Sequence, residues 1–387
     1  MKKIITAIAL TGLLGATGCT KDFPFIPITD KGGTNDDHPL KGGMQAIIDK
    51  WIGEGVPALQ VVVKNKNGWL IARGGYASKE SQTPISGDGT TWIFSITKTY
   101  TAALIMKLKE RGQLDLDKPV KQYLPSSIAT KLKNSQKVTV RNLLNHSSGI
   151  VNFLELDQYR ARQFADPLHQ PTISEILDMV YPEDPQFEPG SATHYSNTNY
   201  LLLGVILEKL TGKSYASLVR SEIIEPLKLE HTYLSLSAAQ IASLKFPQYY
   251  FDPAGDGQLA NGTSWNNAAG NASSSWGGIA ARPTDVILFY EALTNGKVVK
   301  HQSLSEMQQY QNDFGLGIES YQYQPGSTLQ FGHEGDGVGN STMILYAPAS
   351  KAFIFINCTA GRQLPGPYLD KIIDLKNELC AYVVNGS

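Results

Sequence analysis

Residues 341–358 read STMILYAPASKAFIFINC, which are two β-rich runs joined by a proline-containing turn. A similar pattern lies near the start of the chain, where residues 58–77 read ALQVVVKNKNGWLIARGGYA. The Asn67-Gly68 pair within this stretch is a strong signal for a β-hairpin. An amphipathic helix is predicted over residues 368–384. The sequence therefore predicts an antiparallel sheet that takes strands from both ends of the chain.

Helical periodicity dominates the segment between these strands. Helices are predicted over residues 98–111, 172–180, 198–211 and 284–294. Terminal strands with helices inserted between them favour an α+β fold, in which an antiparallel sheet flanked by helices carries a second, mostly helical lobe. Clefts between two lobes are frequent places for an active site.

The overall charge of the chain is nearly balanced. Its 387 residues include 34 basic and 35 acidic side chains, which give a formal net charge of −1. No run of like charge is present, so we expect a small-molecule or peptide substrate and no nucleic-acid partner. The histidines do not have the spacing of a zinc site, and no metal or organic cofactor is implied.

Residues 1–19 have the features of a bacterial export signal. Lys2 and Lys3 precede an apolar stretch over residues 4–14, which is too short to span a bilayer. Small residues then lead to Cys19, a pattern typical of a lipoprotein cleavage box in which the cysteine is lipidated. The alternative is ordinary signal-peptidase cleavage with Cys19 as a bystander. We expect a protein of the bacterial cell envelope, lipid-anchored at the periplasmic face or the cell surface.

The chain divides into three parts. Residues 1–19 form the signal, and residues 20–43 are predicted to be a flexible tether, because they are rich in Pro, Gly and Asp and lack apolar periodicity. Residues 44–387 form one domain. Cys358 ends a strand-like run and Cys380 lies in a helical pattern, so separate buried thiols are expected rather than a disulfide.

The stretch IFSITKTY at residues 93–100 contains the only Ser-x-x-Lys of the chain, formed by Ser95 and Lys98. Apolar residues at helical spacing follow it, so Ser95 is expected at a helix start. Residues three apart share a helix face, which would place Lys98 beside the Ser95 hydroxyl. Two interpretations follow: Ser95 is an N-cap, or it is a nucleophile activated by a lysine one turn along.

Two later patterns complete a recognisable set. Tyr-Ser-Asn at residues 195–197 precedes an apolar helix, and His-Glu-Gly at residues 333–335 lies in a Gly-rich turn before a strand. Ser-x-x-Lys, Tyr-x-Asn and Lys/His-x-Gly, in this order, resemble the signature of the serine β-lactamase and penicillin-binding protein family. The resemblance is to the branch with class C β-lactamases, D-alanyl-D-alanine carboxypeptidases, D-amino-acid peptidases and related esterases. It extends to VTVRNLLNHSSGI and GGIAARPTDVILFYEAL and implies a β-lactamase/transpeptidase-like fold.

The resemblance implies roles for individual residues. Ser95 would be the nucleophile, Lys98 and Tyr195 the candidate general bases, and Asn197 a group that orients Lys98 or the substrate. Lys98 and Tyr195 would titrate as a coupled pair, and the sequence leaves open which of them takes the proton. Backbone N–H groups of Ser95 and Asp336 are expected to bind the oxyanion.

His333, Glu334, Gly335 and Asp336 are expected to bind substrate. Class C β-lactamases carry Lys-Thr-Gly where this chain has His-Glu-Gly, and His333 is at most partly charged at pH 7. If Glu334 pointed inward at roughly 5 Å, it would repel a substrate carboxylate by about 3 kcal/mol at an effective dielectric of about 20. The alternative is that Glu334 points to solvent. Asp336 would act mainly through its backbone N–H.

These expectations favour a cell-envelope serine hydrolase that forms a Ser95 acyl-enzyme on an amide or ester. Weak or absent β-lactamase activity is expected, and carboxypeptidase-like, aminopeptidase-like or esterase activity fits the residues. The alternative is a catalytically silent, membrane-tethered binding protein that retains the fold. His146 is expected to be structural, and Glu155 to be a solvated surface charge.

Overall fold

The computed structural model describes residues 37–323, 328–361 and 366–386. The predicted signal with Cys19, and most of the predicted tether, lie outside the described residues. Helix α1 (Lys41–Gly53) begins before the predicted domain boundary at residue 44. Gly43 permits its close packing, because a Cβ there would lie only 2.1 Å from the hydroxyl oxygen of Tyr382.

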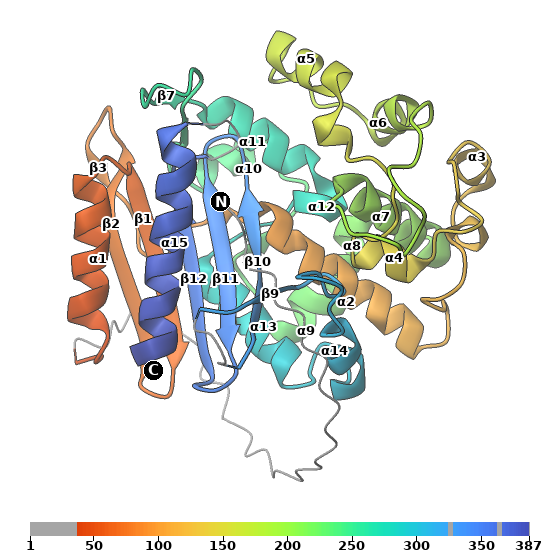
Figure 1. Ribbon diagram of the computed structural model, residues 1–387. Helices are drawn as coiled ribbons and strands as arrows, with labels where there is room; N and C mark the ends of the chain where they lie inside the picture. The colour runs from red at the N-terminus through yellow and green to blue at the C-terminus, as the bar shows by residue number, and fades with distance from the viewer. Residues whose placement is uncertain (1–36, 324–327, 362–365, 387) are drawn as a thin grey trace. The chain divides into compact units, whose positions relative to one another are not determined.

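An antiparallel sheet of seven strands forms the centre of the domain (Figure 1). Its strand order is β3-β2-β1-β12-β11-β10-β9. The first and last hairpins of the domain meet at β1 and β12, where Val61 pairs with Ile356. The strands are β1 (Ala58–Asn65), β2 (Gly68–Ser78), β3 (Thr83–Pro84), β9 (Glu319–Tyr321), β10 (Gln330–Asp336), β11 (Ser341–Ala347) and β12 (Ala352–Cys358).

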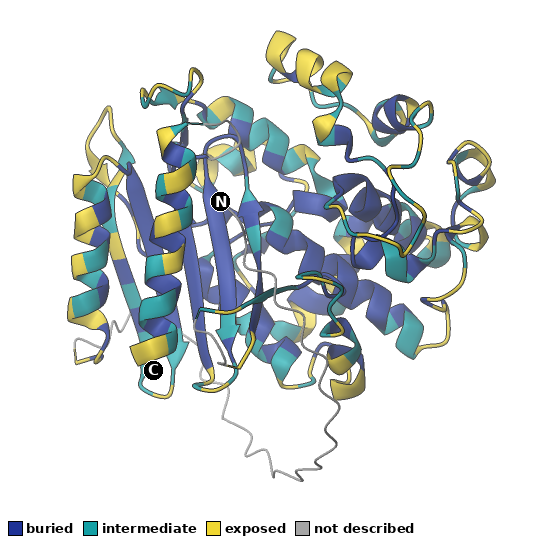
Figure 2. Ribbon diagram, viewed as in Figure 1, coloured by how far each residue is buried: buried dark blue, intermediate teal, exposed yellow. Residues whose placement is uncertain are grey.

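Helices cover both faces of this sheet. Helices α1 and α15 (Pro367–Gly386) pack side by side on one face, whereas α13 (Pro283–Thr294) packs against β1, β11 and β12 on the other (Figure 1). Figure 2 shows buried central strands and exposed outer surfaces on α1 and α15. Every residue of β12 is buried, as expected for a strand covered on both faces.

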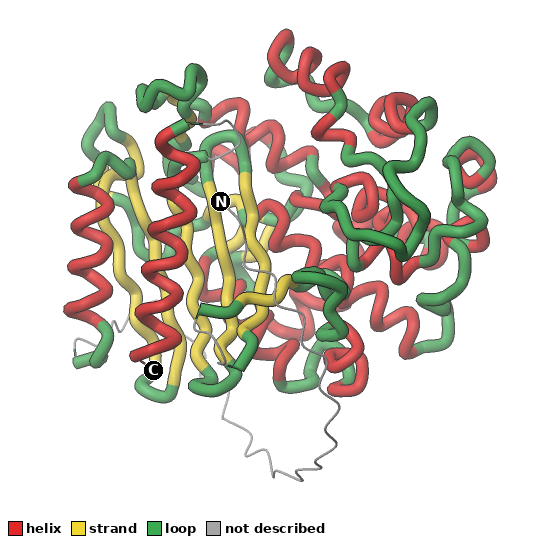
Figure 3. The backbone as a smooth tube through the Cα atoms, viewed as in Figure 1, coloured by secondary structure: helices red, strands yellow, loops and turns green. Residues whose placement is uncertain are grey.

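The chain between β4 and α13 is mostly helix and loop, as Figure 3 shows. Two small sheets accompany it, formed by β4 (Thr91–Trp92), β8 (Ala280–Ala281) and β5 (Thr232–Tyr233), and by β6 (Tyr250–Phe251) and β7 (Ala260–Asn261). The α-helices of this segment are α2 (Thr97–Glu110), α3 (Ser126–Ala129), α4 (Val140–Leu144), α5 (Asp157–Ala165), α6 (Ile173–Val180), α7 (Asn197–Thr211), α8 (Tyr215–Val219), α9 (Glu225–Leu227), α10 (Ala238–Ser243), α11 (Thr263–Ala272) and α12 (Ser274–Gly277), and α14 (His301–Met307) follows α13. Short 3₁₀ turns are η1 (Phe94–Ile96), η2 (Val120–Gln122) and η3 (Phe153–Glu155), and η4 (Arg220–Ile224) is a π-helix.

The predicted fold class is confirmed. The four helices predicted within the chain correspond to α2, α6, α7 and α13, each within one residue of the predicted bounds. One hydrophobic core joins α2, α7 and α13, and a second lies between the sheet and the pair α1 and α15. Cys358 and Cys380 are buried in the second core as free thiols, which confirms the prediction of separate cysteines. Burial raises the pKa of each thiol to about 12.

Candidate active site

Ser95 lies in η1, the short turn that leads directly into α2. Phe94, before it, has a φ of 41°, which is uncommon for a residue with a side chain. The N-cap of α2 is Ile96, and no side chain caps this helix start. The N-cap interpretation of Ser95 is therefore wrong, and its partly exposed hydroxyl contacts Lys98 instead.

Lys98 is fully buried in the first turn of α2. Its Nζ lies 2.8 Å from Ser95 Oγ, 2.8 Å from Asn197 Oδ1 and 2.7 Å from the backbone oxygen of Trp276. All three contacts are to uncharged oxygens. Burial disfavours the ammonium form and lowers the pKa of Lys98 well below its ordinary value, and the carboxylate of Glu319 opposes this shift only in part.

Tyr195 precedes α7, and its phenol is close enough to Ser95 for the serine hydroxyl to influence its pKa. Its ring centroid lies 5.0 Å from Lys98 Nζ and 4.4 Å from the ring centroid of His146. Removal from water raises the pKa of the Tyr195 phenol well above its ordinary value; the charge of Glu319 adds to the shift and the Ser95 hydroxyl opposes it. Tyr195 is therefore a neutral phenol at pH 7.

The lowered pKa of Lys98 and the raised pKa of Tyr195 favour a neutral amine beside a neutral phenol. A neutral amine has two N–H bonds to donate and one lone pair that accepts. Asn197 Oδ1 and the Trp276 oxygen can only accept, so they take the two N–H bonds. The lone pair is then left for the Ser95 hydroxyl, 2.8 Å away. This arrangement suits Lys98 to take a proton from Ser95.

Asn197 is held on its other side by Asn152. The Asn152 Oδ1 accepts hydrogen bonds from Asn197 N at 3.2 Å and from Asn197 Nδ2 at 3.3 Å. Asn152 Nδ2 donates to Glu155 Oε1 at 3.2 Å, and Glu155 Oε2 lies 3.0 Å from Nε2 of His194. Glu155 is exposed as expected, but it also belongs to a chain of hydrogen bonds that connects buried Lys98 to His194 at the surface.

His146 supports the position of Tyr195. It is buried, and its Nδ1 accepts a hydrogen bond from Ser196 N at 3.1 Å while its ring packs on Tyr195. Burial lowers the pKa of His146 well below its ordinary value, so the ring is neutral at pH 7. These contacts agree with the expected structural role.

Strand β10 brings His333 and Gly335 toward the same cluster. The His333 ring centroid lies 6.4 Å from that of Tyr195, and a Cβ at Gly335 would lie 2.1 Å from the backbone oxygen of Ile93. Burial lowers the pKa of His333, which is therefore neutral at pH 7. Its Nδ1 lies 2.6 Å from the backbone oxygen of Glu334; because a carbonyl can only accept, the proton is on Nδ1.

The carboxylates of Glu334 and Asp336 lie on the opposite side of β10, where α15 packs. Lys376 Nζ is 3.1 Å from Glu334 Oε2 and 3.6 Å from Asp336 Oδ1. Side chains alternate along a strand, which separates these two residues from His333 and Gly335. The hypothesis that Glu334 points into the substrate site is therefore wrong, and Glu334 pairs with a buried lysine rather than with solvent alone. Of Glu334 and Asp336, only Asp336 remains a candidate to contact substrate, through its backbone N–H.

Three contributors to this region were not identified from the sequence. Trp276 acts through its backbone oxygen, and a backbone acceptor leaves no signal in residue type. Lys376 lies in an amphipathic helix pattern that gives no hint of its partners. Asn152, in contrast, comes just after the family-like stretch that ends at Ile150, and this proximity was a usable signal.

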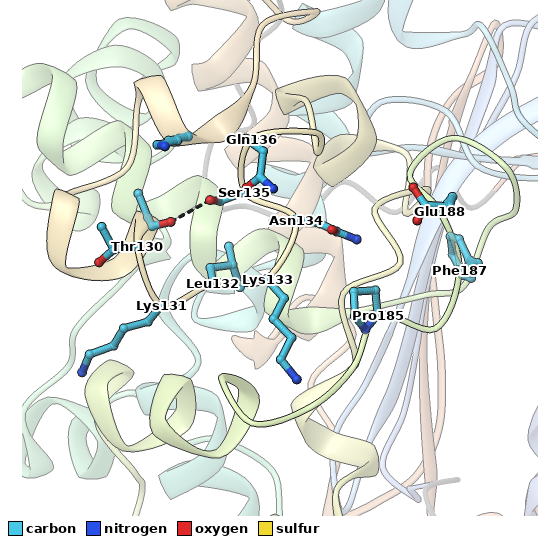
Figure 4. A pocket seen from close by; sticks show the side chains of 12 residues that line it. Thr130, Lys131, Leu132, Lys133, Asn134, Ser135, Gln136, Pro185, Phe187 and Glu188 are labelled. Carbon is cyan, nitrogen blue, oxygen red and sulfur yellow. Dashed lines mark hydrogen bonds between the residues drawn. The ribbon is translucent and has the colours of Figure 1, made fainter.

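A surface cavity of about 760 Å³ lies in the helical lobe (Figure 4). Its lining includes Lys131, Lys133 and Glu188, and Lys133 pairs with Asp184 at 2.8 Å. None of the predicted site residues lines this cavity. The candidate active site is the hydrogen-bonded cluster around Ser95, which is separate from this cavity.

The sequence of the chain is similar to one protein-family model and to curated bacterial proteins. The model of the Beta-lactamase family matches residues 44–373. A putative D-alanyl-D-alanine carboxypeptidase of Salmonella enteritidis PT4 is 28% identical over 245 residues, which cover 59% of this chain and 55% of the relative. A penicillin-binding protein of Bacillus subtilis is 35% identical over 162 residues, 41% of this chain and 33% of the relative. The chain thus spans between a third and about half of the length of these relatives.

Two solved structures are similar over nearly their whole length. The D-amino acid amidase of Ochrobactrum anthropi SV3, in complex with L-phenylalanine amide, has a TM-score of 0.76 and 25% identity, over 89% of this chain and 98% of that one. The D-stereospecific amidohydrolase of a Streptomyces species has a TM-score of 0.71 and 25% identity, over 86% and 96%. The predicted family and fold are confirmed by these matches: the chain belongs to the Beta-lactamase family of serine hydrolases.

Proposed function

We propose that this protein hydrolyses amides through an acyl-enzyme on Ser95, and that its substrates are D-amino-acid amides or short peptides with a D-residue at the scissile bond. The observation that carries the proposal is the 2.8 Å contact between Ser95 Oγ and a buried lysine whose other two contacts are obligate acceptors. Similarity to the D-amino acid amidase and the D-stereospecific amidohydrolase supports the substrate class.

Acylation follows from the positions of three side chains. Ser95 Oγ attacks the substrate carbonyl carbon while its proton passes to the neutral amine of Lys98. The C–N bond then breaks, and the leaving nitrogen takes a proton that the Tyr195 phenol, whose ring centroid lies 5.0 Å from Lys98 Nζ, can relay from Lys98. Water hydrolyses the resulting ester, which releases the acid and restores Ser95. A positioned base of this kind contributes about 10² to 10⁴ in rate.

The developing oxyanion needs donors that are already in place. The backbone N–H groups of Ser95 and Asp336 are the candidates, because they lie on η1 and β10, two elements in direct contact. Gly335 allows this contact, since any Cβ there would collide with Ile93 O. The site thus combines a nucleophile, a neutral base and backbone donors from two elements.

Weak or absent β-lactamase activity remains part of the proposal, for a new reason. Repulsion from Glu334 is not the reason, because its side chain faces Lys376. His333, however, is neutral at pH 7 and supplies no permanent cation where family members with Lys-Thr-Gly hold a β-lactam carboxylate. The exposed carboxylate of Glu155, two hydrogen bonds from Asn197, is suited to attract the ammonium group of an amino-acid amide.

Intact-mass analysis tests the proposal. Wild type and Ser95→Ala are treated separately with a fluorophosphonate and with a penicillin, and hydrolysis of D- and L-phenylalanine amide is followed in parallel. We expect one fluorophosphonate adduct on wild type, none on Ser95→Ala, and faster turnover of the D-amide. A protein with no Ser95-dependent adduct from either reagent would instead be a catalytically silent binding protein.

We also propose that the protein is exported and anchored to the bacterial cell envelope by a lipid on Cys19. The apolar stretch and the small residues before this cysteine support the assignment. In the described part of the chain, no helix is long and apolar enough to cross a bilayer. Metabolic labelling with an alkyne fatty acid should mark wild type but not Cys19→Ala; equal labelling of both would reject the anchor.

A further inference from the structure

Among the described residues two lysines are buried, and one of them is outside the active site. Lys376 lies on α15 with 2% of its surface exposed. Its Nζ contacts Glu334 Oε2 at 3.1 Å and Asp336 Oδ1 at 3.6 Å. These contacts connect the last helix of the chain to the strand that approaches the nucleophile.

The site-facing side of β10 has no room to move closer to Ser95. A Cβ at Gly337, just beyond the strand, would lie 2.2 Å from the Phe94 ring. Thr342 Oγ1 donates to the backbone oxygen of Gly335 at 2.9 Å and lies 3.3 Å from that of Ile93. Strand β10 is therefore packed between the chain that carries Ser95 and the ammonium group of Lys376.

A cation between the two carboxylates reduces their mutual repulsion. Glu334 and Asp336 are two positions apart on one strand face, so their backbones are only about 7 Å apart. Both side chains are about three-quarters buried, where the repulsion between like charges is poorly screened. Lys376 contacts both of them, and Ser341 donates a further hydrogen bond to Asp336.

We propose that Lys376 is a positioning residue for the hydrolase. By binding both carboxylates, it holds the end of β10 in the position at which the Asp336 N–H can donate to the oxyanion. The inference rests on the proposed acyl-enzyme at Ser95. Without the ammonium, mutual repulsion of the carboxylates displaces the end of β10. The Asp336 N–H then misses the oxyanion, although Ser95, Lys98 and Tyr195 stay in place.

The test is the rate at which a fluorophosphonate labels Ser95, followed by intact mass on the full chain. Lys376→Met should lower the second-order labelling rate about 10- to 100-fold, somewhat less than the loss of a whole oxyanion donor. The final adduct should still reach one per folded chain. The dissociation constant of phenylboronic acid, measured by protection against labelling, should rise by a similar factor.

Lys371→Met is the matched control. Lys371 lies on the same helix, but its Nζ donates to the backbone oxygen of Glu54, so its loss should leave the labelling rate within about twofold of wild type. A purely structural role for Lys376 would reduce the fraction of chains that label but not the rate of the competent fraction. That result would overturn the inference.

A milder variant covers the case in which Lys376→Met does not fold. Glu334→Gln keeps the shape of the side chain but removes the 3.1 Å ion pair, so Lys376 holds β10 only through its longer contact with Asp336. Labelling should slow about 3- to 10-fold, less than in Lys376→Met because no repulsion between carboxylates remains; a wild-type rate overturns the inference. Failure of the proposed function is distinguishable, because wild type itself would then take no Ser95-dependent adduct. Failure of the positioning role alone leaves wild type labelled and the variants equally fast.

Discussion

The two buried lysines of the described chain lie on opposite sides of β10 and have opposite surroundings. Lys98 contacts three uncharged oxygens, from Ser95, Asn197 and Trp276. Lys376 instead contacts two carboxylates. Burial is nearly equal at the two positions, so the charge of the contacts decides the role. One lysine is suited to take a proton and the other to hold a strand.

Removal of Lys98 should have the largest effect on activity. Lys98→Met should lower kcat/KM for D-phenylalanine amide about 10³- to 10⁴-fold, because Ser95 loses its proton acceptor. The same variant should be at least as stable as wild type, since a buried lysine without an ion-pair partner is replaced by an apolar side chain. Steady-state kinetics and urea unfolding measure the two effects. Activity within tenfold of wild type would break the assignment of Lys98 as base.

Removal of Lys376 should have the opposite effect on stability. Lys376→Met should lower the free energy of unfolding by about 2 to 3 kcal/mol, because the Glu334 and Asp336 carboxylates lose the Lys376 ammonium. This is less than for a fully buried pair, since the side chains of Glu334 and Asp336 are about one-quarter exposed. Urea unfolding with Lys371→Met as control measures the change. Equal stability changes in the two buried-lysine variants would remove the contrast between the sites.

The pH dependence of stability should distinguish wild type from Lys98→Met. Its folded pKa lies below its unfolded pKa, so the unfolded state binds more protons between the two values and stability rises with pH across that window. The stability that Lys98→Met gains over wild type should therefore grow as pH falls from the ordinary lysine pKa through the window. A constant difference from pH 6 to pH 10 would contradict the lowered pKa.

Activity should show the same titration. kcat/KM should rise with pH as Lys98 loses its proton, by up to tenfold per pH unit, and should level off above the lowered pKa of Lys98. No descending limb from Tyr195 is expected near neutral pH, because burial raises its pKa. A profile that falls between pH 7 and pH 9 would assign the essential proton to Tyr195 and not to Lys98.

The smallest effect is expected at the exposed end of the hydrogen-bond chain from Lys98. Glu155→Gln should raise KM for D-phenylalanine amide about 3- to 10-fold, because an exposed carboxylate attracts an ammonium group only modestly. The KM for p-nitrophenyl butyrate, a substrate without an amine, should not change. Equal effects on both substrates would show that Glu155 acts through Asn152 and Asn197 rather than on the substrate amine.

Much of the architecture follows from local patterns in the sequence. Alternating and continuous apolar runs located β1, β2, β11 and β12, and helical periodicity located α2, α6, α7 and α13. The three-residue spacing of Ser95 and Lys98 also predicted their contact, because it depends only on one helical turn. Patterns of short range were therefore sufficient for these features.

The remaining features depend on which elements meet in space. Strand alternation separates Glu334 from His333, but it does not reveal which face receives α15. Lys376 is distant in sequence from both of its carboxylates, and its helix pattern is the same whether it meets a charge or solvent. Residue type made Ser95 a candidate cap of α2, yet η1 places it one residue before the cap at Ile96. Tertiary contacts decided each of these outcomes.

The rate of fluorophosphonate labelling at Ser95, compared between wild type and Lys98→Met by intact mass, tests the central claim most directly. We expect wild type to take one adduct per chain, Ser95→Ala to take none, and Lys98→Met to label about 10³-fold more slowly at pH 7. The rate in wild type should increase with pH up to the lowered pKa of Lys98 and then level off, and that increase should disappear in Lys98→Met. Labelling of Lys98→Met at the wild-type rate would contradict a neutral Lys98 as the base that activates Ser95.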